Sequence, residues 1–365
     1  MADINRFTQA YDRASASAKG YAFADGWKQF LTDTVPIKVL LGSAEGPTTS
    51  QSAKLDTLRT KLKEATAKTE ADIILDMAGV KGTGALSDAQ ADAVATLKLL
   101  RHLYFSEDKG NQSLWIYAQP YSFHKWVFDE IKGCTPADAK TKLNYMDEVY
   151  DETIRGSMST GVQQALSWSL NCVAKLGSPN DATKTVITRW FFSGTAATEA
   201  MTKAAATLLG GFTKVANLCN STKLIFSDEP IDRMKGDAVT GQTHYKSNWN
   251  DYAFVDGAAS RERLDVVYIQ NATLTKWASA DTSWMATLAI IHELTHRLIA
   301  TKDAVYDFTG LKPGTVLTHE HAIVNADSWA YFAADLNGQL PSSQCTQVWK
   351  QPPSLRAAYL SALSH

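Results

Sequence analysis

The sequence lacks the features that would place the chain in a membrane or on nucleic acid. No run of about 18 apolar residues occurs, which argues against a membrane-spanning helix. The formal net charge is only −2, so there is no overall positive field to attract nucleic acid or an anionic membrane. We therefore expect no nucleic-acid partner and no membrane span, and nothing in the sequence indicates an oligomeric state.

Cysteines are few and widely spaced, and no leader is visible. The four cysteines form no C-x-x-C pair, which argues against a structural zinc knuckle, and they are compatible with two disulfides or none. They are Cys134, Cys172, Cys219 and Cys345. The first residues are polar and contain no apolar core of a signal peptide. Three routes stay open: the chain is cytoplasmic, a leader has been removed, or the chain is exported without a cleaved signal.

The two parts of the chain differ in their secondary-structure patterns. At 365 residues the chain is long for a single core, so two domains are expected. Residues 1–144 have mainly helical patterns, and the helix predicted from residue 87 begins with a capping box formed by Ser87 and Gln90. We predict a mostly helical N-terminal domain over residues 1–144, which serves as a pro-segment, a targeting module or a scaffold.

Residues 145–365 combine helices with short β-like runs. These runs are KLIFS at 223–227, YAFV at 252–255 and LDVVYI at 264–269. The segment DTSWMATLAIIHELTHRLIA that follows them returns to helical spacing. We predict an α+β fold for this second domain, with a small antiparallel sheet and a helix that carries the functional residues.

That helix contains His292, Glu293 and His296 in the pattern H-E-x-x-H. Residues four apart lie one turn apart on the same face of a helix, roughly 6 Å from each other. Two imidazoles in this arrangement can bind one zinc ion at about 2.0–2.1 Å each. Glu293 follows the first histidine and can take a proton from a zinc-bound water, whose pKa the metal lowers to about 7. The pattern predicts a zinc site rather than a buried helix that happens to contain two histidines.

A catalytic zinc site needs a third protein ligand and one open position. Three carboxylates are candidates for that ligand. Asp303 lies seven residues after His296, so one tight turn returns it to the metal with little loop-closure cost. Glu320 lies on a later segment, and Asp327 lies further along the same segment. The spacing favours Asp303 and leaves the other two open.

Three motifs in order resemble the aspzincin zinc metallo-endopeptidases, the family of deuterolysins and lysine-specific metallo-endopeptidases. HELTH followed by TKDAVY is similar to the family's H-E-x-x-H and G-T-x-D-x-x-Y-G, and NADSWAYF at 325–332 is similar to its N-A-D-S/T-x-x-x-F helix. Weaker similarities are TRWFF at 188–192 and VVYIQNATL at 266–274. The resemblance spans roughly residues 145–340.

The resemblance implies a zincin-like metallo-endopeptidase domain that follows the helical one, with Zn²⁺ as cofactor and a protein or peptide as substrate. It implies His292, His296 and Asp303 as zinc ligands. Glu293 is then the general base that deprotonates the zinc-bound water. Tyr306 corresponds to the tyrosine that steadies the oxyanion in the family, a role that a phenol can perform as a hydrogen-bond donor. A secreted protease or an exported toxin or effector fits this activity.

The chain departs from the family at three positions. Ala300 and Asp307 stand where the family has glycine, so we expect the loop to follow a somewhat different path. Ala330 stands where lysine-specific members have the second carboxylate of their lysine pocket. Asp327 is either the remaining carboxylate of that pocket or a hydrogen-bond partner of a ligand histidine. Two other functions stay open, a zinc amidase that acts on cell-wall peptides and an inactive binding protein with a relic metal site.

Overall fold

A computed structural model describes part of the chain, and this part forms two compact units. The described residues are 53, 69–105, 107–108, 114–117, 127–144, 152–227, 253–255, 264–269, 277–278, 282–357 and 359–360. Unit 1 consists of Met1–Arg155, Ser221–Tyr252 and Glu262–Thr273, and unit 2 of Gly156–Asn220, Ala253–Arg261 and Leu274–His365. The units are therefore built of alternating stretches of sequence. The linear division into residues 1–144 and 145–365 stays a prediction.

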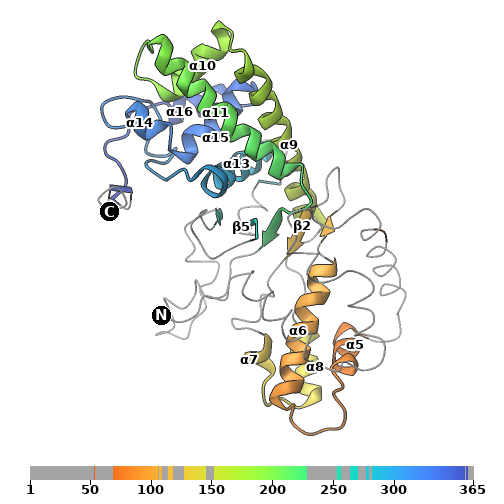
Figure 1. Cartoon of the computed structure of the whole chain (residues 1–365). Helices are drawn as coiled ribbons and strands as arrows, with labels where there is room; N and C mark the ends of the chain where they lie inside the picture. Colours follow the sequence, from red (N-terminus) through yellow and green to blue (C-terminus); the bar gives the residue numbers. More distant parts are fainter. Residues whose placement is uncertain are drawn as a thin grey trace. The chain divides into compact units, whose positions relative to one another are not determined.

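The described part of unit 1 contains a group of helices and a small sheet (Figure 1). The helices are α5 (Glu70–Met77), α6 (Asp88–Phe105), α7 (Val127–Ile131) and α8 (Pro136–Asn144). α5 packs on α6 and α8, and α6 packs on α7. The predicted capping box is present at the start of α6: the Ser87 amide donates to Gln90 Oε1 at 3.0 Å, and the Gln90 amide donates to Ser87 Oγ at 3.3 Å.

The sheet of unit 1 is parallel at its centre, so the prediction of an antiparallel sheet is wrong. Its strands are β1 (Glu107–Asp108), β2 (Leu114–Tyr117), β3 (Ile225–Ser227) and β5 (Val266–Ile269). β2 pairs with β3 and β3 with β5 in parallel, while the two-residue β1 pairs antiparallel with β2. Apolar runs locate strands, but the connections set their direction. The chain between β2 and β3 contains helices α7 and α8 and then further helices that belong mainly to unit 2, and parallel strands need such a crossover.

The described part of unit 2 is mainly helical and carries the H-E-x-x-H segment (Figure 1). Its elements are α9 (Glu152–Gly177, which begins at the end of unit 1), α10 (Asp181–Phe191), α11 (Thr198–Cys219), β4 (Ala253–Val255), α13 (Ser283–Ile299), α14 (His319–Ala322), α15 (Ala326–Leu336) and α16 (Ser342–Val348). α10 and α13 both pack against α15, and α11 packs against α10 and α13. The short strand β4 lies against α13.

An aromatic cluster joins α10, α11 and α15. The Trp190 and Tyr331 rings have centroids 5.8 Å apart, and those of Phe212 and Trp329 are 5.3 Å apart. The Trp190 indole N–H also donates to Asp335 Oδ2 at 2.8 Å. Aromatic pairs of this kind contribute about 0.5–1.5 kcal/mol each beyond their buried area. The segments TRWFF and NADSWAYF therefore pack against each other, which fixes α15 within unit 2.

Gly211 of α11 permits the close approach of Trp329. A Cβ atom at Gly211 would overlap ring atoms of Trp329, whereas a Cβ atom at the exposed Gly210 would meet nothing within 4 Å. We expect Gly211→Ala to lower the free energy of unfolding by about 1–3 kcal/mol, because the indole and α15 must shift. Gly210→Ala is the matched control and is expected to raise it by about 0.5–1 kcal/mol. Denaturant unfolding measures both, and equal stabilities of the two variants would contradict the close packing.

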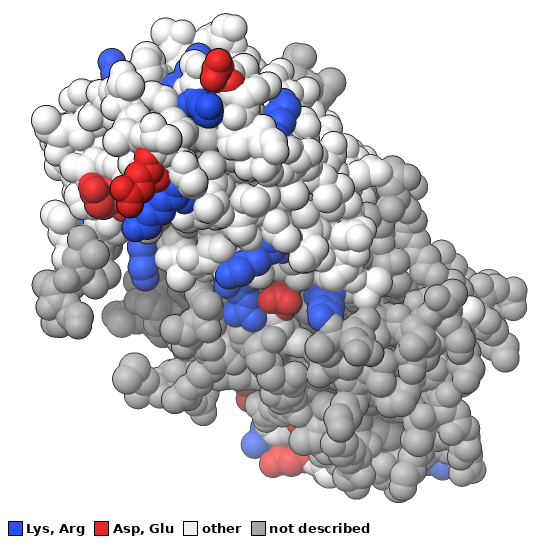
Figure 2. Space-filling model, turned by 45° about the horizontal axis from the view of Figure 1, so that its top comes forward, with Lys and Arg blue, Asp and Glu red and all other residues white. Residues whose placement is uncertain are grey.

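Side chains of both charge signs are interspersed on the described surface drawn in Figure 2. In the part of the chain that the structure describes, no helix has the length and apolar character needed to cross a membrane. All four cysteines are free thiols, so of the two arrangements left open by the sequence, the one without disulfides is found.

Candidate metal centre

The two histidines of the H-E-x-x-H segment meet on one side of α13. The helix is anchored in unit 2 by the buried side chains of Ile290, Ile291 and Leu294. The imidazoles of His292 and His296 lie edge to face with centroids 4.8 Å apart, and their Nε2 atoms are 3.1 Å apart. The helical period brings both rings to the same place because residues four apart share a face.

A tight turn follows α13 and leads the chain back toward the histidines. Ala300 ends the helix in the left-handed conformation, with φ 58° and ψ 35°, although it is not a glycine. The Lys302 amide then donates to the Val324 carbonyl at 2.7 Å, and the Ala326 amide donates to the Lys302 carbonyl at 2.9 Å. These bonds tie the turn to the start of α15. Asp307, at the second glycine position of the family, has no positive φ and so needs no glycine.

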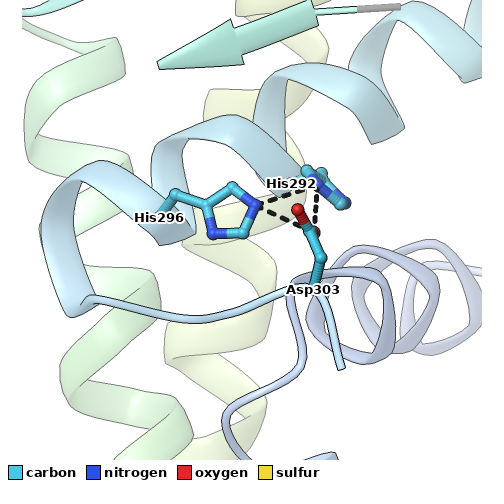
Figure 3. Close-up of side chains that lie close together, drawn as sticks. All are labelled: His292, His296 and Asp303. Atoms are coloured by element: carbon cyan, nitrogen blue, oxygen red, sulfur yellow. Dashed lines mark hydrogen bonds and ion pairs between the residues drawn. The ribbon is translucent and has the colours of Figure 1, made fainter. Parts of the chain in front are cut away.

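The turn places Asp303 against both imidazoles (Figure 3). Asp303 Oδ1 lies 3.2 Å from His292 Nε2 and 3.1 Å from His296 Nε2. Among the described residues, these three side chains form the one group of His, Cys, Asp or Glu found able to hold a metal ion, with ligand atoms all within 4.8 Å of one another. The structure therefore brings together the three residues that the resemblance implies as zinc ligands.

The donor atoms have the spacing that zinc requires. Three corners of a tetrahedron with bonds of about 2.0–2.1 Å lie roughly 3.3 Å apart. The corresponding separations here are 3.1, 3.2 and 3.1 Å. Two imidazoles and a carboxylate are also a common donor set for catalytic zinc. The residues present therefore fit the metal in both spacing and chemistry.

His296 supplies an independent argument for a cation. Its Nδ1 lies 2.8 Å from the Thr301 carbonyl oxygen, which can only accept a hydrogen bond. Nδ1 of the neutral ring must then carry the proton, and the lone pair on Nε2 points into the cluster. There it faces His292 Nε2 and the carboxylate of Asp303 at 3.1 Å each. A metal ion at the centre would satisfy these lone pairs together.

The charges around the cluster also favour a cation. Burial lowers the pKa of His292, but the negative charge of Asp327 and hydrogen bonds with Asp303 and Asp327 outweigh it and raise this pKa well above its usual value. Burial raises the pKa of Asp303, yet hydrogen bonds with both histidines hold it well below its usual range. Both shifts have the sign expected of a site where nearby negative charge favours a positive charge at the cluster.

Asp327 contacts the ring nitrogen of His292 that faces away from Asp303. Its Oδ1 lies 2.6 Å from His292 Nδ1, and its Oδ2 accepts the Asp307 amide at 2.8 Å. The residue is only 6% exposed. With both oxygens engaged, Asp327 is placed to fix the tautomer and orientation of His292. Glu320, the other alternative ligand, is exposed and lies outside the cluster.

We expect Asp327→Asn to weaken zinc binding by about 10–100-fold, because the amide removes the charge that orients His292 and presents N–H groups to the Asp307 amide. Chelator competition on the purified variant measures the affinity. Asp335→Asn on the same helix is the control, since Asp335 accepts hydrogen bonds from Arg189 and Trp190 instead. It is expected to lower stability without changing zinc affinity. Equal zinc affinities of the two variants would contradict the proposed role of Asp327.

Asn325 of the NADS segment holds the loop that bears Asp303, and Ser328 in turn contacts Asn325. The buried Asn325 accepts the Val305 amide on Oδ1 at 3.0 Å and donates from Nδ2 to Ser328 Oγ at 3.1 Å. The motif that contains Asn325 and Ser328 was visible in the sequence. Their roles were not, because each hydrogen bond depends on how α15 packs beside the loop.

The remaining predicted residues lie close to the cluster or next to it in sequence. Tyr306 Oη lies 3.2 Å from Asp303 Oδ2. Glu293 follows His292 on α13 and is 6% exposed. Arg356, which no motif indicated, donates from Nη1 to Tyr306 Oη at 2.6 Å. It lies 53 residues beyond Asp303, so only the folded chain could reveal it.

A helix with H-E-x-x-H and an aspartate that returns to it are features typical of zinc metallopeptidases. Residues 177–334 match the family model of the aspzincins, described as lysine-specific metallo-endopeptidase. The chain thus carries an aspzincin domain over these residues, which confirms the resemblance found in its motifs. Zinc is the cofactor of this family, and the His-His-Asp cluster can bind it. Comparison with curated proteins found no match.

Proposed function

We propose that the chain is a zinc-dependent endopeptidase whose ligands are His292, His296 and Asp303. The observation that carries the proposal is the convergence of two Nε2 atoms and one carboxylate oxygen within the spacing of a single metal ion. Structural zinc sites are usually closed by four protein ligands, whereas catalytic sites keep one position open. The group found among the described residues offers three protein ligands, the number typical of catalytic sites. The family match supports a peptide substrate.

In the proposed reaction, Glu293 moves the proton. When bound, zinc acidifies a water molecule and polarises the scissile carbonyl. The Glu293 carboxylate takes a proton from the attacking water and passes it to the leaving nitrogen, so that a C–O bond forms and the C–N bond breaks. Asp327 and the Thr301 carbonyl meanwhile keep the proton of each imidazole on Nδ1, as their distances to those nitrogens allow.

Tyr306 is the proposed donor to the negative oxygen that develops during attack. Its hydroxyl lies 3.2 Å from Asp303 Oδ2, at the margin of the ligand cluster. A hydrogen bond that strengthens as charge develops lowers the barrier without tightening substrate binding to the same degree.

The acidic pocket by which lysine-specific members of the family bind lysine is incomplete in this chain. Both oxygens of Asp327 are hydrogen-bonded within the protein, and Ala330 offers no carboxylate. We propose that these two positions do not select lysine. The peptidase activity is assigned to residues 145–365, with residues 1–144 as a pro-segment, targeting module or scaffold.

The test is cleavage-site profiling on a proteome-derived peptide library, with zinc-loaded protein, with chelator, and with zinc added back. We expect cleavage within peptide chains that the chelator stops and zinc restores, without enrichment of lysine after the cut. Peptidoglycan fragments are assayed in parallel. Release of cell-wall peptides without cleavage of the library would favour the amidase, and zinc binding without turnover on either substrate would favour the binding protein.

A further inference from the structure

The C-terminal segment runs back to the metal centre and lies beyond the residues matched by the family. Backbone hydrogen bonds guide it there: the Leu311 amide donates to the Val348 carbonyl at 2.8 Å, and the Lys312 amide donates to the Lys350 carbonyl at 3.1 Å. The Arg356 amide then donates to the Ala304 carbonyl at 2.8 Å, one residue after Asp303. These backbone hydrogen bonds hold the segment so that the Arg356 side chain lies next to the cluster.

Arg356 contacts both Tyr306 and Asp303. Its Nη1 donates to Tyr306 Oη at 2.6 Å and approaches Asp303 Oδ2 at 3.4 Å. Its guanidinium carbon lies 4.9 Å from the centroid of the Tyr306 ring, within the range of a cation–π contact. Tyr306 Oη in turn donates to Asp303 Oδ2 at 3.2 Å. The two oxygens of Asp303 therefore have different partners. Oδ1 faces the imidazoles, and Oδ2 faces the tyrosine and the arginine.

We propose that Arg356 is a positioning residue that orients the Asp303 carboxylate and the Tyr306 hydroxyl. Because the arginine can only donate, Tyr306 Oη accepts from it and keeps its own proton for donation. A nearby positive charge also makes the hydroxyl a stronger donor toward an oxygen that becomes negative. The interactions at Oδ2 limit rotation of the carboxylate, so that Oδ1 stays toward the imidazoles. The inference about Tyr306 rests on the proposed function, whereas the one about Asp303 needs only metal binding.

A general contribution to stability does not explain the arrangement. The Arg356 side chain is 42% exposed, and its ion pair with Asp303 is 3.4 Å long. Exposed ion pairs of this kind contribute little to folding. The effect of Arg356 is therefore expected in metal affinity and turnover rather than in the free energy of unfolding.

The experiment compares Arg356→Met and Arg356→Lys with the parent, with the exposed Lys350→Met as a matched loss of positive charge in the same segment. Chelator competition measures zinc affinity, and steady-state assays measure kcat and KM. We expect Arg356→Met to weaken zinc binding by about 10-fold and to lower kcat more than it raises KM. Arg356→Lys should show a smaller loss of zinc affinity and of kcat than Arg356→Met. Lysine keeps a positively charged donor but lacks the planar guanidinium group. Lys350→Met is expected to match the parent.

A double-mutant cycle with Tyr306→Phe separates the two contacts. Tyr306→Phe is expected to retain zinc and to lower kcat, and Arg356→Met should then lower kcat much less in that background than in the parent. Independent, additive losses of kcat would overturn the role through Tyr306. Zinc affinity of Arg356→Met within twofold of the parent would overturn the role at Asp303. If the parent cleaves no peptide, the proposed function fails, and the zinc affinities still show whether Arg356 orients Asp303.

Discussion

Replacing Glu293 by Gln is expected to abolish most peptide hydrolysis while zinc and the fold are retained. Glu293 is 6% exposed and lies on α13 next to His292, a proposed zinc ligand. Glutamine has nearly the same size, so the helix should pack as before. The glutamine amide cannot take a proton from water at neutral pH. The loss of a general acid–base group lowers turnover by about 10²–10⁴-fold. KM should change far less than kcat, because the proton is transferred only during reaction.

The measurement is kcat on a cleaved peptide, with zinc content and thermal unfolding recorded on the same preparations. Glu199→Gln, in the exposed first turn of α11, is the control for the loss of one carboxylate. It should behave as the parent in all three measurements. Near-normal turnover of Glu293→Gln would show that another group accepts the proton, and the proposed mechanism would then be wrong even if zinc is bound.

Removal of a proposed zinc ligand is expected to have the second large effect. We expect His292→Ala, His296→Ala and Asp303→Ala each to weaken zinc binding by more than the roughly 10–100-fold produced when an outer hydrogen-bond partner is lost. Each change removes one of the three donor atoms that lie 3.1 or 3.2 Å apart. Turnover should fall with zinc occupancy. Metal analysis after dialysis should give about one zinc per parent chain and much less for each variant.

The comparison with Glu320→Gln identifies the third ligand. Glu320 is exposed and stands outside the cluster, so its replacement should leave zinc affinity unchanged. Asp303 lies within one turn of the α13 C-terminus, and its Oδ1 faces both imidazoles. Retention of zinc by Asp303→Ala together with its loss in Glu320→Gln would contradict the ligand set proposed here and favour a ligand from the later helix.

Parts of the fold followed from local sequence because their causes are local. The capping box of Ser87 and Gln90 needs only a spacing of three residues, and the structure contains it. The predicted β-like runs at 223–227 and 264–269 contain strands β3 and β5, respectively. Strand direction was predicted wrongly, because pairing depends on segments far apart in the chain. β2 was not foreseen either, since LWIY lies between helical patterns and becomes a strand by pairing with β3.

The candidate site likewise combines features that local sequence determines with features that only the tertiary structure reveals. The sequence alone determined that His292 and His296 share a helix face and that Asp303 can return within one turn, because helical period and short loops are local properties. Only the tertiary structure showed that Asp327 contacts His292 from 35 residues away and that Arg356 contacts Asp303 from 53 residues away. The first contact requires α15 to pack against α13, and the second requires the C-terminal segment to lie beside the loop that bears Asp303. That packing depends on the aromatic cluster and on backbone bonds between distant segments, and no local pattern encodes it.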